Sequence, residues 1–326
     1  MDYLSVYNTS FYKHVESHVL GQEPTGLYEP ANYILALGGK RIRPILALLG
    51  CHLYTDDFTK AMKAAMSVEV FHNFTLVHDD IMDNASIRRG QPTVHEKFGA
   101  SQAILTGDVM LIHAYEMLLS YNPISLSHRL LSIFNKMSVE LCMGQQMDMD
   151  FEKSDTVSIG DYIKMIELKT AVLLGASLQM GALIGGAGEE DAAHLYLFAL
   201  NFGIAFQLQD DVLDTFGTKS NVGKRIGGDI IQNKKTYLYL KALELADEKQ
   251  KNNLLQMYDS SNTLSEENKI EAVTDIFLRT GVKEYASQVM EAYRDLAISH
   301  VYSCNISKDK KDILIRFVND FLYRES

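Results

Sequence analysis

Hydrophobic positions recur about every 3.6 residues along nearly the whole chain, which is the period of amphipathic helices. We find no run of apolar and polar alternation long enough to predict a strand. The pattern predicts an all-α protein, with helices over residues 6–20, 59–83, 94–119, 125–152, 171–188 and 192–216, and further amphipathic helices over residues 240–326.

Helix boundaries are marked by their own signals. Gly38 and Gly39 are expected to end one helix, and Pro44 lies near the start of the next, where its missing N–H costs little. Residues 158–161 (Ser-Ile-Gly-Asp) and 263–266 (Thr-Leu-Ser-Glu) fit the capping-box pattern, so we expect a helix to begin after each.

The composition is that of one well-packed globular protein. A length of 326 residues would allow two domains, but with five prolines and no Ser/Gly/Pro-rich linker the sequence predicts a single all-helical domain over residues 1–326. A net charge of −11 argues against a nucleic-acid surface, because affinity for the phosphate backbone comes largely from clustered Lys and Arg.

The chain has no features of export or of membrane insertion. Residues 1–20 lack a basic segment followed by an apolar run, so we expect no signal peptide. Residues 171–188 come nearest to a membrane span, but they contain Ser177, Gln179 and several glycines and are better interpreted as a buried, closely packed helix. Cys51, Cys142 and Cys304 are far apart and odd in number, which indicates a reduced, cytoplasmic protein.

The sequence HDDIMD places carboxylates on one predicted helix. His72, Thr75, Asp79 and Asp83 fall within about 40° of one line on an ideal helix, and Asp80 is adjacent. Like charges at this spacing repel, and Mg²⁺, which takes oxygen ligands and substrate phosphates, is the simplest compensation. An isolated DDxxD is more often a solvated surface turn, but five apolar neighbours argue against it here: Phe74, Leu76, Val77, Ile81 and Met82.

A second acidic cluster has the same spacing about 130 residues later, in FQLQDDVLD. Four polar side chains are expected on one face of this helix, namely Gln207, Asp210, Asp211 and Asp214. Solvated acidic faces do not ordinarily recur with one spacing inside apolar helices, so the pair predicts a metal site far more strongly than either cluster alone.

Basic residues lie near these clusters in the sequence. Lys40, Arg41 and Arg43 fall at a predicted helix N-terminus, where free N–H groups attract anions, although surface basic residues at a loop are the simpler explanation there. The others are Arg88 and Arg89, Lys169 beside Thr170, and the group in the Gly-rich segment 221–236, comprising Lys224, Asp229, Lys234, Lys235 and Thr236. Arginine forks and lysines in these places are suited to binding phosphate groups.

Two smaller points stayed open. Asp148 and Asp150 form either a polar helix end or part of the wall of the same cavity. Glu69 and His72 make an ExxH pair, as in di-iron helical bundles, but such bundles need two of these motifs and we find only one.

Six motifs together resemble the trans-isoprenyl diphosphate synthases, also called polyprenyl synthetases. They are GGKRIRP, HDDIMD followed by RRG, GQQMD, KTA, FQLQDDVLD and GGDIIQNKKT, in the family's order over residues 38–236. The resemblance implies antiparallel helices around a central cavity, a homodimer, and Mg²⁺, about three ions per active site, as the cofactor. It implies condensation of isopentenyl diphosphate with an allylic diphosphate such as the dimethylallyl, geranyl or farnesyl compound.

The resemblance also implies roles for residues. Isopentenyl diphosphate would be held by Lys40, Arg43, His72 and Arg89, and the allylic diphosphate by Arg88, Lys169, Lys234 and Lys224. Metal ligands would be Asp79, Asp80, Asp83, Asp210, Asp211 and Asp214. Thr170 and Gln207 would face the reacting carbons, and Lys169, Thr170 and Gln207 would be the catalytic residues.

The resemblance also implies a short prenyl diphosphate as the product. An aromatic residue five positions before the first cluster, here Phe74, is similar to members making C20 or C15 products, so we expect geranylgeranyl diphosphate first and farnesyl diphosphate second. Spacing alone does not place Phe74 in the cavity, and Phe74 and Phe71 are either the floor or ordinary core. A non-catalytic regulatory subunit and a class I terpene cyclase are the two alternatives. The complete acidic clusters argue against the first, and the isopentenyl residues argue against the second.

Overall fold

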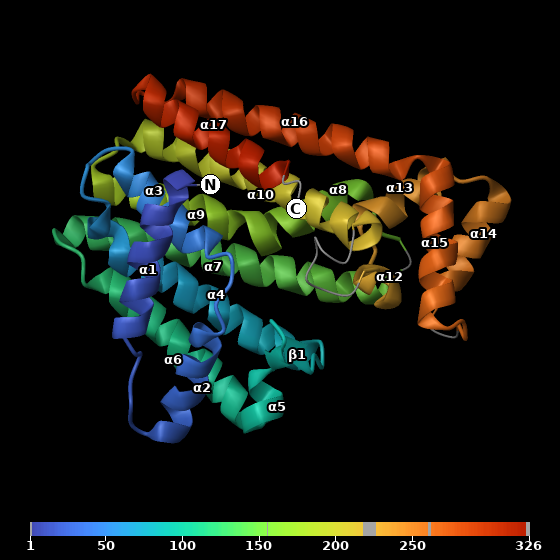
Figure 1. The fold of residues 1–326 in the computed structure, drawn as a ribbon, viewed down its shortest axis with the longest axis horizontal. Helices are drawn as coiled ribbons and strands as arrows, with labels where there is room; N and C mark the ends of the chain where they lie inside the picture. The colour runs from blue at the N-terminus through green and yellow to red at the C-terminus, as the bar shows by residue number, and fades with distance from the viewer. Residues whose placement is uncertain (1, 155, 218–225, 260–261, 324–326) are drawn as a thin grey trace. The chain divides into compact units, whose positions relative to one another are not determined.

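The computed structural model describes residues 2–154, 156–217, 226–259 and 262–323, and most of them are helical (Figure 1). The chain forms two compact units, Met1–Met137 with Leu173–Tyr196, and Ser138–Val172 with Leu197–Ser326. The predicted all-α class is confirmed. A single domain over residues 1–326 stays a prediction.

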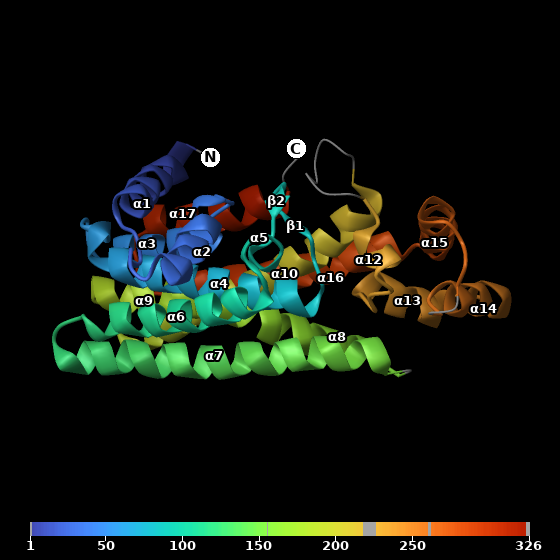
Figure 2. The ribbon, with the colours of Figure 1, turned by 90° about the horizontal axis from the view of Figure 1, so that it is seen from below.

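The first unit is organised around α4, the helix that carries the first acidic cluster. Its elements are η1 (Asp2–Leu4), α1 (Ser5–Ser17), α2 (Thr25–Ala36), α3 (Ile42–His52), η2 (Phe58–Ala61), α4 (Met62–Met82), β1 (Ile87–Arg88), β2 (Gln91–Pro92), α5 (Val94–Phe98), α6 (Ala100–Leu119) and α9 (Val172–Gly185). Helix α6 runs alongside α4 in both views (Figures 1 and 2). Helix α9 meets α3 so closely that a Cβ atom on Gly181 would lie 1.9 Å from the carbonyl oxygen of Ala47.

Two details of this unit differ from the sequence-based expectation. The helix predicted over residues 94–119 is broken at Gly99, which has a φ of +92° and separates α5 from α6. A small antiparallel ribbon pairs Ile87 with Pro92 and Arg88 with Gln91. Its two-residue loop, Arg89 and Gly90, has φ values of +53° and +75°, as a type I′ hairpin requires.

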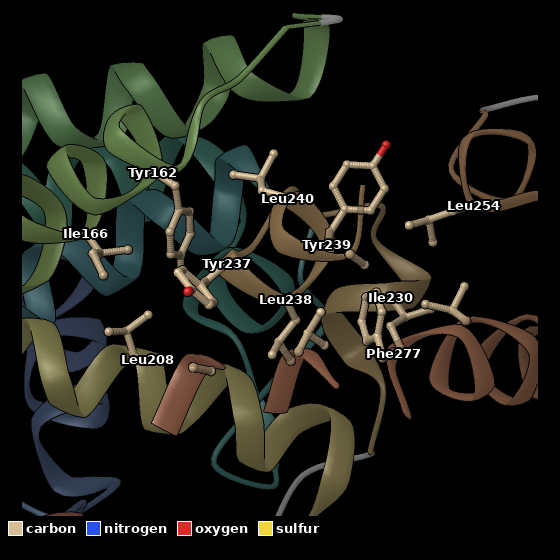
Figure 3. Packing of buried hydrophobic residues seen from close by; sticks show 14 of the residues in the cluster. Tyr162, Ile166, Leu208, Ile230, Tyr237, Leu238, Tyr239, Leu240, Leu254 and Phe277 are labelled. Atoms are coloured by element: carbon tan, nitrogen blue, oxygen red, sulfur yellow. The ribbon is translucent and has the colours of Figure 1, made fainter. Parts of the chain in front are cut away.

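The second unit holds the other acidic cluster and the C-terminal helices. Its elements are α7 (Ile124–Lys153) and α10 (Glu189–Phe216), which both begin in the first unit, with α8 (Ile159–Ile166), η3 (Glu167–Ala171), α12 (Gly228–Ile231), α13 (Tyr237–Leu245), α14 (Glu248–Met257), α15 (Glu266–Thr280), α16 (Val282–Ser303) and α17 (Lys308–Leu322). Figure 3 shows its core, where Tyr162 of α8 and Leu208 of α10 belong to the same buried cluster as Leu238 of α13 and Phe277 of α15.

The two predicted capping boxes had different outcomes. At α8, the Ser158 hydroxyl accepts from the Asp161 N–H at 3.1 Å and the Asp161 carboxylate accepts from the Ser158 N–H at 3.1 Å, so this box is confirmed. The box predicted from Thr263 is wrong. The residue that caps α15 is Ser265, whose hydroxyl accepts from the N–H of Asn268, three residues into the helix.

One helical stretch in the described part of the chain, Ile159–Gly185, is long and apolar enough to cross a membrane by length and composition. Within its most apolar window, 67% of the residues are buried in the protein. A buried stretch of this kind is typical of a core helix, in agreement with the interpretation of residues 171–188.

Candidate active site

The first acidic cluster lies at the C-terminal end of α4, where its three aspartates have different surroundings. Asp80 is buried, with 1% of its side chain exposed, and it is held by a bidentate contact with Arg88. The Arg88 Nε atom donates to both carboxylate oxygens at 2.8 and 2.9 Å. Asp79 is half-buried and Asp83 is exposed, so their oxygens are the accessible ones of the cluster.

The hairpin at Arg88 and Arg89 connects this cluster to the Gly38–Gly39 loop. Arg88 points to Asp80, whereas Arg89 donates from its Nη1 atom to the carbonyl oxygen of Gly38. A Cβ atom on Gly39, which has a φ of +131°, would lie 2.9 Å from Arg89 Nη2. Glycine is favoured at this position by its backbone conformation, and it lets the guanidinium approach closely.

Arg43 and His72 form a second polar contact, with 3.3 Å between Arg43 Nη1 and His72 Nε2. Because a guanidinium only donates, His72 Nε2 must be the acceptor, which puts the ring proton on Nδ1. Burial, and then the charge of Arg43, hold the pKa of His72 well below its ordinary value. Burial also lowers the pKa of Arg43 to about 10. The site thus presents a neutral imidazole among arginines.

A buried ion pair that the motifs did not indicate lies behind these residues. Arg41 has a left-handed backbone (φ +48°), and its guanidinium pairs with Glu69 of α4, both side chains being 2% exposed. Asn73 donates from Nδ2 to the Glu69 carboxylate at 2.9 Å. Glu69 is therefore the counter-ion of Arg41. This role argues against Glu69 as an iron ligand, and so against the di-iron interpretation. An acidic residue within the apolar run MSVEVF was the available signal, since a buried carboxylate needs a partner.

The second acidic cluster lies near the C-terminal end of α10. Asp211 is buried and accepts from the Tyr162 hydroxyl and, at 3.3 Å, from Gln207 Nε2. Burial raises the pKa of Asp211 well above its ordinary value, and the charge of Asp229 adds to this. Asp210 and Asp214 are half-buried and so more accessible than Asp211, but of the three only Asp211 lines the cavity with Gln207. None of the sequence motifs indicated that Tyr162 would contact this cluster.

The segment after α10 is tied back to this cluster. The N–H groups of Gly227 and Asp229 donate to the Asp214 backbone and side chain, at 2.7 and 3.0 Å. Lys234 lies 3.6 Å from the Asp229 carboxylate and is exposed. Lys235 has a structural contact instead, because its Nζ atom donates at 2.7 Å to the carbonyl oxygen of Phe151 near the end of α7. Lys224 lies outside the described residues.

A cavity of about 130 Å³ in the second unit gathers several predicted site residues. Its walls include Asp148, Lys169, Thr170, Gln207, Asp211 and Lys234. Lys169 contacts Asp148 at 2.6 Å, and the Thr170 hydroxyl donates to Gln207 Oε1 at 3.3 Å. Asp148 therefore lines the cavity, whereas Asp150 is exposed and accepts from Gln146 at 2.8 Å.

Two residues of the cavity wall lie in an irregular helical turn. Lys169 and Thr170 lie in η3, a π-helical turn, and such turns occur frequently at functional sites. Gly144 of the GQQMD motif faces that turn, since a Cβ atom there would lie 2.3 Å from the Lys169 backbone nitrogen. The glycine allows α7 to approach the turn closely enough for Asp148 to reach Lys169.

The aromatic residues before the first cluster have different degrees of burial. Phe71 is 1% exposed and makes an edge contact with Phe134, with 5.0 Å between ring centroids. Phe74 is half-buried, with ring centroids 5.4 Å from Phe71 and 4.9 Å from His78. Phe71 thus packs as core, and Phe74 is the less enclosed of the two.

The donor chemistry of both clusters fits a hard divalent cation. The six aspartates of the two clusters offer carboxylate oxygens, which are the ligands that Mg²⁺ prefers. Neither DDxxD sequence contains a cysteine or a histidine. Among the described residues, no three His, Cys, Asp or Glu side chains already lie close enough to hold a metal ion by themselves. Mg²⁺ does not require such a cage, because it usually binds through one or two carboxylates together with substrate phosphates and water.

Basic side chains and two aspartate clusters in an all-α fold are typical of a metal-dependent enzyme that acts on diphosphates. Known proteins agree with this class. The polyprenyl synthetase family model matches residues 24–277, and the chain belongs to this family. It is a trans-prenyltransferase.

Similar proteins cover most of the chain. A short chain isoprenyl diphosphate synthase of Methanocaldococcus jannaschii is 42% identical over 74% of this chain and 74% of its own length. The geranylgeranyl diphosphate synthase of Sulfolobus acidocaldarius is 35% identical over 95% of this chain and 94% of its own. A crystal structure of a geranylgeranyl pyrophosphate synthase has a TM-score of 0.94 at 42% identity, covering 99% of each chain.

Proposed function

We propose that this prenyltransferase condenses an allylic diphosphate with isopentenyl diphosphate, with geranylgeranyl diphosphate (C20) as the main product and farnesyl diphosphate (C15) as the next candidate. The observation that supports it best is the meeting of carboxylates and cationic side chains in each unit: Arg88 pairs with Asp80 of the first cluster, and Lys169 and Lys234 pair with Asp148 and Asp229 in the cavity that Asp211 lines. The names of the similar proteins support the C20 product.

The basic residues of the first unit are suited to isopentenyl diphosphate. Arg43 and Arg89 supply planar guanidinium groups that can bind phosphate oxygens bidentately. Lys40 is exposed just before α3, the helix that carries Arg43. Neutral His72 accepts from Arg43 and so fixes the orientation of that guanidinium. Arg88, Lys169 and Lys234, with Lys224, are assigned to the allylic diphosphate.

Metal binding is assigned to the aspartates of both clusters. The most accessible of them are Asp79, Asp83, Asp210 and Asp214. Asp80 is engaged by Arg88, and Asp211 by Tyr162. Mg²⁺, when bound, supplies positive charge that stabilises the departing diphosphate. A 27% identical synthase from Corynebacterium glutamicum with a TM-score of 0.84 was crystallised with isoprenyl diphosphate and magnesium, which supports this cofactor. We assign about three ions per active site.

The chain itself positions groups around the allylic carbon. Thr170 donates to Gln207 Oε1, and Gln207 donates from Nε2 to Asp211, so these contacts fix the direction of the amide dipole. Oxygen dipoles held in this way stabilise a developing carbocation without having to reorganise. Lys169 neutralises charge on the leaving group, and the proton lost from the new carbon chain passes to the released diphosphate. Excluding water protects the cation from quenching.

The proposal is tested by incubating the purified protein with isopentenyl diphosphate and each of the three allylic diphosphates, with Mg²⁺ or with a chelator. We expect a longer prenyl diphosphate, seen by chromatography, only when Mg²⁺ is present. Release of diphosphate without a longer chain would indicate a terpene cyclase and would contradict the proposal. No release under any condition would indicate the regulatory subunit.

Product length is expected to depend on Phe74. Phe74→Ala removes a half-buried ring from α4, and the space gained should lengthen the main product by at least one five-carbon unit. Phe71→Leu is the matched control on the same helix, because Phe71 packs as core against Phe134. Chromatographic sizing of both products decides the assignment, which fails if Phe74→Ala leaves the length unchanged.

The homodimer is proposed through one face of α6. Opposite the buried positions of this helix lies an exposed apolar stripe, formed by Ile104, Leu105, Ile112 and Leu119. A stripe of this kind at helical spacing is typical of a surface covered by another chain, and the occupant we propose is a second copy. Sedimentation should give twice the mass of one chain, and Ile112→Asp should reduce it to one; a wild-type monomer would refute the dimer.

A cytoplasmic location is proposed from the three cysteines, none of which forms a disulfide in the described part of the chain. Fractionation of the source cells tests it, and recovery of the protein with an exported or membrane fraction would contradict it.

A further inference from the structure

Besides the cavity of the second unit, the structure has a cavity of about 630 Å³ in the first unit. None of the residues that line it belongs to the candidate active site. It lies between α1, the junction of η2 with α4, and the turn that joins α6 to α7. Its basic lining consists of Lys13, Lys60 and Lys63, with the imidazole of His14 beside them. Most of its other lining is hydroxyl or amide, from Ser10, Ser17, Thr59, Ser120, Tyr121 and Asn122.

The charges of this cavity are unusual for the chain. The protein has a net charge of −11, yet no carboxylate lines the cavity. Within the described ranges, none of Lys13, Lys60 and Lys63 forms an ion pair with a carboxylate. The nearby Asp57 is engaged in capping η2, where its side chain accepts from the Thr59 N–H at 3.2 Å. Three lysines thus line one cavity that holds no carboxylate, and an anion bound there would reduce their repulsion.

The surrounding backbone keeps this arrangement in place. The Tyr121 hydroxyl donates to the Lys60 carbonyl oxygen at 3.0 Å and accepts from the Ala64 N–H at 3.0 Å, which joins the α6–α7 turn to the start of α4. On α1, the rings of His14 and His18 stack with 3.8 Å between centroids. The first turn of α4 has no acidic residue, so the positive end of its dipole adds to the lysine charges.

We propose that this cavity, which we name the lysine cavity, binds a small molecule bearing a phosphate or diphosphate group at a position separate from the prenyl-transfer site. Lys13, Lys60 and Lys63 neutralise the group, and the hydroxyls around it donate to its oxygens. The volume lies in the range of small-ligand pockets and exceeds what a bare phosphate needs, so the ligand carries a further moiety.

The test follows the imidazole of His14 by NMR while inorganic sulfate, the probe for a divalent oxyanion, is added. The His14 signal is assigned by comparison with His14→Gln. We expect a saturable shift in the wild type, and binding weaker by about tenfold in the variant Lys13→Ala/Lys60→Ala/Lys63→Ala. Sulfate that also binds at the active site does not disturb this readout, because His14 lines only the lysine cavity.

A matched variant controls for net charge. Lys249→Ala/Lys251→Ala/Lys308→Ala removes the same three charges from exposed positions on α14 and α17, and it should bind sulfate at the His14 site as the wild type does. Both triple variants should retain prenyl transfer, since none of the six lysines belongs to the proposed active site. A failure of the proposed function therefore leaves this test intact.

A second experiment identifies the source of the phosphate group. Vesicles of phosphatidylcholine with and without phosphatidylglycerol are sedimented with the wild type and both triple variants. Binding to anionic vesicles that needs Lys13, Lys60 and Lys63, without a response to sulfate, would assign the group to a lipid. If neither probe binds, or if the two triple variants bind equally, the lysine cavity is not an anion site.

Discussion

Asp210→Asn is expected to lower kcat/KM for prenyl transfer by about 10²–10³-fold while leaving the protein folded. Asp210 is the half-buried first aspartate of the second cluster and is assigned as a metal ligand. The amide keeps the shape of the side chain but lacks its charge, so the charge of the departing diphosphate is less well neutralised in the transition state. Steady-state kinetics over a range of Mg²⁺ concentrations measure the effect, and the variant should need more Mg²⁺ for half-maximal rate.

Asp150→Asn provides the matched control. It also converts an aspartate near a helix end, but Asp150 is exposed and belongs to neither acidic cluster. We expect its kcat/KM to stay within about twofold of the wild type. Equal rates for Asp210→Asn and the wild type at every Mg²⁺ concentration would remove Asp210 from the metal ligands.

The contrast within each acidic cluster follows from helix geometry. Neighbours at i and i+4 lie within about 40° of each other, whereas neighbours at i and i+1 lie about 100° apart. Asp79 and Asp83 can therefore share a face, while Asp80 is directed toward the protein interior. In the second cluster the same rotation buries Asp211 and leaves Asp210 accessible. The motif spacing contains this distinction, although the prediction grouped all six aspartates together.

Local patterns predicted the fold well because helices are local structures. The apolar period gave α4 and α10 to within a few residues, and a Ser-x-x-Asp pattern located the start of α8. The hairpin at Arg88 and Arg89 was missed because two-residue strands have no measurable alternation, and because a positive φ at an arginine is uncommon.

The partners of site residues were less predictable because they come from distant segments. Tyr162 and Asp211 are 49 positions apart, and Lys235 reaches a carbonyl 84 positions away. Nothing in the motifs separates Lys235 from Lys234, yet one supports the end of α7 and the other is exposed at the cavity. Which lysine serves structure and which is available for substrate depends on packing.

The largest loss of stability is expected from Glu69→Gln, which should lower the free energy of unfolding by about 3–5 kcal/mol. Glu69 is buried and is the counter-ion of Arg41, so the amide leaves a buried guanidinium without compensating charge. Urea unfolding followed by circular dichroism measures the change. Glu271→Gln, an exposed glutamate on α15, is the control and should change stability by less than about 0.5 kcal/mol.

Removing both charges separates the cost of an unpaired ion from the value of the pair. Arg41→Met/Glu69→Leu should recover much of the stability lost by Glu69→Gln, because burying two apolar side chains avoids the desolvation of either ion. Arg41 lies between Lys40 and Arg43 with a left-handed backbone, so the double variant should still show a raised KM for isopentenyl diphosphate. A recovered stability with an unchanged KM would mean that the ion pair supports folding alone. If Glu69→Gln proves as stable as Glu271→Gln, the pair contributes little and the shape of the Gly38–Gly39 loop must depend on Arg89 and Tyr12, which contact its carbonyl oxygens.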